Sequence, residues 1–132
     1  MLAVEDYIAA LDWAKDVGGL SGLKARATAN AQTIWDFCET RDWIDNLAND
    51  PATRSNTSVC LKFTDTRIQD GAKFAKAVAK RLENQGVAYD IGAYRDAPAG
   101  LRVWCGGTVE TSDVALMLPW LEWAFEQEIE AQ

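Results

Sequence analysis

The chain has 132 residues, a length that suits one domain with its own hydrophobic core. Its composition is 48% hydrophobic and 25% charged, which is typical of a globular protein and excludes a disordered chain. The net charge of −7 argues against a nucleic acid partner, because phosphate binding requires clusters of Lys and Arg.

The N-terminal part of the chain is predicted to be helical. Apolar residues recur at helical spacing over residues 3–17, which predicts an amphipathic helix that ends at Gly18 and Gly19. A second helix is predicted over residues 21–40. Its buried face is expected to comprise Leu23, Ala27, Ala31, Ile34, Phe37 and Cys38.

Four segments of the sequence are predicted to be strands. Residues 57–64 alternate apolar and polar side chains, as a half-buried strand does. Residues 87–91 and 101–105 are predicted to be two further short strands. A weaker strand is predicted over residues 43–47, followed by a loop rich in Asn, Asp and Pro.

Two more helices are predicted in the second half of the chain. The first covers residues 70–84. The second begins at Thr111 or Ser112, and its apolar stripe is expected to comprise Val114, Met117, Leu118, Leu121, Ala124 and Phe125. Pro119 lies within this helix, so the helix either kinks there or has a separate first turn.

This order of elements predicts an α+β fold, with a small, mainly antiparallel sheet of three or four strands and helices packed on one face. No linker or repeat interrupts the sequence, so we expect residues 1–132 to form a single domain. No apolar run reaches the roughly 18 residues of a membrane-spanning helix, and the first residues lack the features of a signal peptide. A cytoplasmic location is therefore expected.

The chemistry available to the chain is limited because it contains no histidine. That absence excludes Ser-His-Asp and Cys-His catalytic machinery and zinc sites with His ligands. The widely spaced Cys38, Cys60 and Cys105 are expected to be buried, reduced thiols. Gly106-Gly107 lacks the spacing of a phosphate-binding loop and is expected to form a tight turn. No catalytic residue and no metal site are predicted.

An arginine stands second in the mostly apolar strand at 101–105. Alternate side chains of a strand point to opposite faces, so Arg102 and Trp104 are expected to point away from the core. A guanidinium on that open face offers a planar fork of donors that matches a carboxylate or a phosphate. Two interpretations remain open: an anion-binding arginine, or a solvated or ion-paired one. Arg95, in the loop before the strand, is a second candidate with the same two interpretations.

Four segments of the sequence are distinctive: MLAVEDYIAALDWAKDVGGL, SNTSVCLKF, GVAYDIGAYRDAPAGLRVWCGGTVETSD and LPWLEWAF. Together they resemble the phosphoserine aminotransferase family, in the form found in alphaproteobacteria. The resemblance extends over nearly the whole chain and is most specific between residues 86 and 113. It covers only the C-terminal third of those enzymes, which is the small domain of a class V, fold-type I transaminase that depends on pyridoxal phosphate.

The resemblance implies an activity and a site. The activity is reversible amino transfer between phosphoserine and 2-oxoglutarate, giving 3-phosphohydroxypyruvate and glutamate in serine biosynthesis, by a homodimer with active sites at subunit and domain interfaces. In the family an arginine on the matching strand binds the α-carboxylate of the substrate, a role that falls on Arg102. A basic residue a few positions upstream helps to hold the substrate phosphate or side-chain carboxylate, and Arg95 is the nearest match.

The resemblance also implies that essential parts lie elsewhere. Such an enzyme needs a lysine that forms a Schiff base with the cofactor and an acid paired with its pyridine nitrogen. In the family both belong to the large domain, which this sequence does not contain. We therefore expect Met1 to be an internal methionine, and we expect this chain alone to bind no cofactor and to catalyse nothing. The alternative is a free-standing, non-enzymatic α+β module that binds a small anion or mediates assembly.

Overall fold

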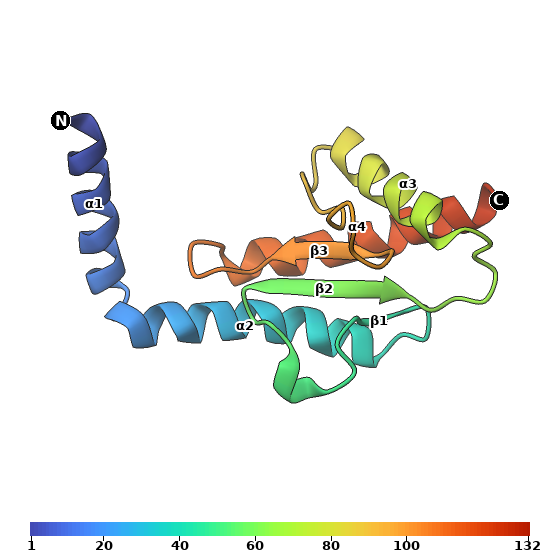
Figure 1. Cartoon of the computed structure of the whole chain (residues 1–132), viewed down its shortest axis with the longest axis horizontal. Coiled ribbons are helices and arrows are strands. Elements are labelled where there is room, and N and C mark those ends of the chain that lie inside the picture. The colour runs from blue at the N-terminus through green and yellow to red at the C-terminus, as the bar shows by residue number, and fades with distance from the viewer.

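A computed structural model describes all residues, 1–132, and confirms the α+β fold (Figure 1). The helices are α1 (Leu2–Asp16), α2 (Gly19–Glu39), α3 (Gly71–Asn84) and α4 (Thr111–Glu130), with a short 3-10 turn at Pro51–Thr53. The strands are β1 (Ile44–Asn46), β2 (Ser58–Phe63) and β3 (Leu101–Trp104). They form one antiparallel sheet in the order β1-β2-β3, whose core side faces the helices.

The pairing of β2 with β3 separates the two faces of the sheet. Val59 lies opposite Val103, and both are buried in the core. Cys60 lies opposite Arg102 in the same register, so these two side chains share the other face. Cys60 is therefore half-buried, and the prediction that all three cysteines are buried is wrong for it.

The core fills the space between the sheet and helices α2, α3 and α4. At its centre four aromatic rings pack together, with Trp43 stacked on Phe125 at 4.0 Å and Phe74 edge-on to Phe63 at 5.1 Å. The predicted apolar stripe of α4 is buried throughout, and all but Leu23 of the buried face predicted for α2 is buried as well. Helix α4 continues through Pro119, which excludes a separate first turn.

The predicted strand at 87–91 is wrong. This segment belongs to the loop between α3 and β3, and only Gly92 pairs with β3, in an isolated bridge to Leu101. Asp90 has a φ of 54°, a left-handed conformation that a strand cannot contain. The backbone N–H of Arg102 nevertheless donates to the carbonyl of Ile91 at 2.8 Å, so the loop lies along the outer edge of β3.

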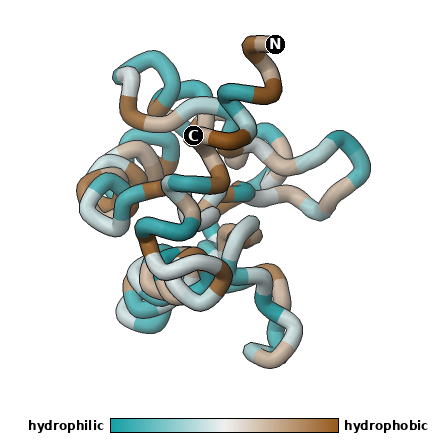
Figure 2. The backbone as a smooth tube through the Cα atoms, turned by 90° about the vertical axis from the view of Figure 1, so that its left-hand side faces the viewer, coloured by the Kyte–Doolittle hydropathy of each residue, from teal (hydrophilic) through white to brown (hydrophobic).

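Helix α1 stands apart from the rest of the molecule (Figure 1). Val17 and Gly18 separate it from α2, and the positive φ of Gly18 and of Gly19, the first residue of α2, confirms the predicted end of the helix. The apolar face of α1 is present as predicted, yet no residue of the helix is buried, and Ile8 and Leu11 remain exposed. Along this N-terminal helix the tube in Figure 2 alternates between hydrophobic and hydrophilic colours. No helix of the molecule has the length and hydropathy to cross a membrane.

Gly100, which directly precedes β3, allows the backbone there to pack closely against β2. A Cβ atom at this position would lie only 1.9 Å from the carbonyl oxygen of Leu61 on β2. That separation is far inside van der Waals contact, and the atom it meets belongs to the backbone of a paired strand, which cannot move without breaking the ladder. A side chain is therefore excluded at the residue directly before β3.

Candidate functional site

Arg102 projects from β3 on the face of the sheet that the helices leave open. Its neighbours in the strand, Leu101 and Val103, are buried in the core, whereas Trp104 is 58% exposed. The alternation of faces predicted for this strand is confirmed. The arginine is thus carried by a rigid element whose position is fixed by its pairing with β2.

The guanidinium of Arg102 lies among loop residues but makes no hydrogen bond with them. Its central carbon lies 4.1 Å from the centre of the Tyr94 ring, which it stacks against. Its Nη2 atom lies 4.0 Å from Oδ2 of Asp90, too far for a hydrogen bond. The side chain is 20% exposed, and its Nε atom is buried without a partner. The buried Nε is out of reach of a ligand, whereas the Nη groups make no hydrogen bond within the chain and remain available to an anion.

The contact with Asp90 does not tie Arg102 to an internal acid. The Asp90 side chain is 95% exposed, so water screens its charge and the pair contributes little. A ligand carboxylate could take the place of this contact, because a guanidinium binds a carboxylate best through two parallel N–H···O bonds. The geometry suits a carboxylate or a phosphate approaching from the open face.

Arg95 lies on the exposed part of the same loop. Together with Lys76 of α3 it lines a shallow depression of about 200 Å³ between that helix and the loop. No hydrogen bond or ion pair connects Arg95 to another residue. Tyr94 both lines this depression and stacks on Arg102, so it links the two predicted positions.

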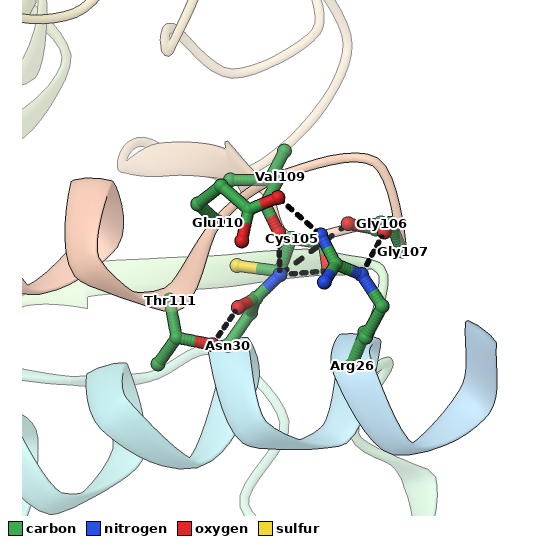
Figure 3. Close-up of polar contacts among 8 residues, drawn as sticks. All are labelled: Arg26, Asn30, Cys105, Gly106, Gly107, Val109, Glu110 and Thr111. Atoms are coloured by element: carbon green, nitrogen blue, oxygen red, sulfur yellow. Dashed lines mark hydrogen bonds and ion pairs between the residues drawn. The ribbon is translucent and has the colours of Figure 1, made fainter. Parts of the chain in front are cut away.

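A buried polar network holds the segment that follows β3 (Figure 3). Nδ2 of Asn30, on α2, donates to the carbonyls of Cys105, Gly106 and Val109, and its Oδ1 accepts from the Thr111 hydroxyl at 2.6 Å. The backbone N–H of Val109 donates to the carbonyl of Gly106, which closes the tight turn predicted there. This network fixes the C-terminal end of β3 and the first turn of α4 against α2.

Arg26, one turn before Asn30, completes the same anchor. Its Nε donates to the Gly107 carbonyl at 2.6 Å, and its Nη2 pairs with Glu110. Sequence reasoning missed both residues. The sequence did carry a signal for Asn30. It lies one helical turn from Ala27 and from Ile34, so its side chain is expected on the buried face of α2.

Two of the three thiols, and the lysines of the chain, do not provide a nucleophile. Burial raises the pKa of Cys105 to about 11, and burial together with the charge of Asp45 does the same for Cys38. Of the six lysines only Lys62 is even half-buried, and it donates to Asn49. A lysine that reacts with an aldehyde cofactor needs a setting that lowers its pKa. No lysine here has an apolar setting of that kind, and no cluster of metal-binding side chains is present.

Comparison with curated proteins relates the chain to phosphoserine aminotransferases. It is 45% identical over 126 residues to the phosphoserine aminotransferase of Methanosarcina mazei, an alignment that covers 96% of this chain and 33% of that protein. The phosphoserine aminotransferase of Methanosarcina barkeri is 46% identical over 127 residues, with 95% of this chain and 32% of that protein covered. The chain thus spans about a third of the length of these relatives. No family model matches it.

Solved structures show the same fold. The phosphoserine aminotransferase from Bacillus circulans subsp. alkalophilus superposes with a TM-score of 0.73 at 18% sequence identity, covering 88% of this chain and 30% of that one. A second phosphoserine aminotransferase structure gives a TM-score of 0.71 over the same shares. The resemblance to phosphoserine aminotransferases predicted from the sequence is confirmed by the curated relatives, and the α+β fold is confirmed by these structures.

Proposed function

We propose that residues 1–132 are the C-terminal small domain of a cytoplasmic phosphoserine aminotransferase, and that its large, cofactor-binding domain belongs to the part of the enzyme that this chain does not span. The observation that carries the proposal is 45% identity over 126 residues that make up only a third of the relative. The proposed reaction is amino transfer between phosphoserine and 2-oxoglutarate, giving 3-phosphohydroxypyruvate and glutamate. The whole enzyme is proposed to be a homodimer.

Arg102 is proposed to bind the α-carboxylate of the amino-acid or oxo-acid substrate. Its place on the open face, its rigid strand and the lack of a hydrogen bond to its Nη groups support this role. A charge-assisted, bidentate contact contributes roughly 1.5–3 kcal/mol, and it also orients the substrate for reaction. Arg102 would thus set the position of the α-carbon relative to the group that reacts with it.

Arg95 is proposed to contact the far end of the substrate, which is a phosphate in phosphoserine and a second carboxylate in glutamate. The depression that it lines with Lys76 offers two positive charges to such a group. Arg95 is exposed and unpaired, so its reach toward a ligand is not restricted by an internal acid.

The residues of this chain do not fit the cofactor itself. Pyridoxal phosphate supplies an electron sink for amino transfer when it is held by a Schiff-base lysine. The exposed or hydrogen-bonded lysines described above lack the setting such a lysine needs, so no step through the cofactor is assigned to this chain. Its proposed contribution is to bind and orient the substrate.

Helix α1 supports the view that further protein covers this domain. Its exposed apolar face, with Ile8 and Leu11, would be buried against the large domain in the whole enzyme. The relatives are about three times as long as the chain, which leaves ample protein to cover this helix.

The decisive experiment begins with the reading frame upstream of the Met1 codon. A continuous frame encoding a lysine-bearing transaminase domain is expected, and the whole polypeptide should then convert 3-phosphohydroxypyruvate and glutamate in a coupled assay. A stop codon upstream, with no such frame, would instead favour the free-standing anion-binding module.

The role of Arg102 is tested in the same enzyme by Arg102→Ala. The value of kcat/KM for both amino-acid substrates should fall roughly 10- to 100-fold, the loss expected from one bidentate contact, while the cofactor absorbance spectrum is unchanged. Arg67→Ala is the matched control, because Arg67 is exposed and pairs only with Asp65. Equal kinetics in the two variants would contradict the assignment.

A further inference from the structure

We infer that Tyr94 is a positioning residue for Arg102: its ring holds the guanidinium in one plane, ready for a substrate carboxylate. The inference rests on the proposed function for its catalytic consequence, although the contact itself belongs to this chain. Tyr94 and Arg102 come from the loop after α3 and from β3, and they meet across 4.1 Å.

The ring of Tyr94 has no other evident role in the fold. It is 68% exposed, lies outside the hydrophobic core, and its hydroxyl makes no hydrogen bond. Its backbone, however, is well placed, because the Tyr94 carbonyl accepts from the N–H of Ala97 at 3.0 Å in a turn. A few residues earlier, the Ile91 carbonyl accepts from the N–H of Arg102, which keeps the loop beside the strand. The stack is thus supported at the backbone on both sides.

The stack matters because Arg102 has no other fixed partner. An arginine side chain has several rotatable bonds, and its ordering on binding a ligand opposes affinity. Stacking on an aromatic face restricts those bonds while leaving the edges of the guanidinium, which carry the donors, free. Without the ring the guanidinium could rotate toward the exposed carboxylate of Asp90, now 4.0 Å away, and a substrate would have to compete with that acid.

The contact is tested first in this chain alone, by NMR of the arginine Nε–H groups. The Arg102 signal, identified by its loss in Arg102→Lys, should be shifted upfield by the ring current of Tyr94 and should exchange slowly with water. Tyr94→Phe should keep both properties and Tyr94→Leu should lose both. Tyr89→Leu is the control, since Tyr89 is equally exposed on the same loop but does not contact Arg102. An unchanged Arg102 signal in Tyr94→Leu would overturn the inference, whatever the function of the protein.

The consequence is tested by kinetics of the whole enzyme. Tyr94→Leu should raise KM for glutamate and phosphoserine about tenfold, which corresponds to ~1.4 kcal/mol, while kcat changes less than twofold. Tyr94→Phe should restore KM. In an Arg102→Lys background, which lacks the planar group, Tyr94→Leu should have little further effect.

The outcomes separate the two proposals. An inactive whole polypeptide would refute the proposed function and leave the NMR result standing. An active enzyme in which Arg102→Lys raises KM but Tyr94→Leu does not would refute the positioning role alone. A tenfold effect of Tyr94→Leu that persists in the Arg102→Lys background would also refute it, because Tyr94 would then act on the substrate or on the fold directly.

Discussion

Replacing Asn30 by alanine is expected to lower the free energy of unfolding by about 3 kcal/mol. The Asn30 side chain is fully buried. It makes one bond of 2.9 Å to Val109, one of 2.6 Å from Thr111, and two longer contacts of 3.2 and 3.3 Å to Cys105 and Gly106. The Asn30 amide has only two N–H hydrogens for three carbonyls, so the two long contacts are counted as one hydrogen bond. This leaves three hydrogen bonds at roughly 1 kcal/mol each. The loss is a large fraction of the roughly 5–15 kcal/mol by which domains are stable.

Urea unfolding followed by tryptophan fluorescence measures this loss, and Gln32→Ala provides the matched control. Gln32 lies on the same helix and donates to Asp36 at 2.6 Å, but the pair is exposed, so its removal should change stability by less than about 0.5 kcal/mol. If Asn30→Ala cost no more than Gln32→Ala, water would have to satisfy the exposed carbonyls after β3. The buried hydrogen bonds of Asn30 would then not be what holds the end of β3 and the start of α4 against α2.

Three further predictions follow from the same structure. Burial holds the pKa of Cys38 and Cys105 near 11, above the unfolded value, so the folded state resists ionisation of both thiols. The free energy of unfolding should keep its full value below about pH 9. It should decrease by roughly 2–3 kcal/mol per thiol as the pH rises to 11, which urea unfolding measures. Arg41 donates two hydrogen bonds to Glu122, both of 2.9 Å, and these lower the pKa of that carboxyl. Their contribution to the free energy of unfolding is therefore present above about pH 4.5 and is lost as the pH falls. Glu122→Gln should cost about 1 kcal/mol at pH 7, since the pair is partly solvated, and this cost should decrease as the pH falls below 4.5. Finally, this chain alone should self-associate through α1, and Ile8→Glu should make it monomeric by light scattering; a wild-type monomer at high concentration would contradict this.

Helix positions were predictable because periodicity alone decides them. The stripe of α4 repeats at helical spacing and is buried as expected, and the buried residues of α3, Phe74, Ala75, Val78 and Leu82, recur at the same spacing. Periodicity also predicted the direction of Arg102. Side chains of β3 alternate between the two faces, so Arg102 points away from the core that Leu101 and Val103 face.

The loop before β3 was not predictable in the same way. VAYDI has the composition of a strand, but the left-handed Asp90 and the turn at Tyr94 direct its path, and neither leaves a periodic signal. For that reason the sequence indicated an arginine on an open face but not the tyrosine stacked beneath it. The depression lined by Arg95 and Lys76 depends on the same loop path, so it could not be predicted from the sequence pattern either.

Gly100 has a consequence for any attempt to redesign this domain. Because the Leu61 oxygen occupies the space of a Cβ there, randomising position 100 should return almost exclusively glycine among folded clones. The segment upstream, residues 93–97, is exposed, so the fold limits side chains less there, and substitutions in it would act mainly on the proposed roles of Tyr94 and Arg95. At this one position the approach of the paired backbone, rather than any side-chain contact, decides which amino acid the fold accepts.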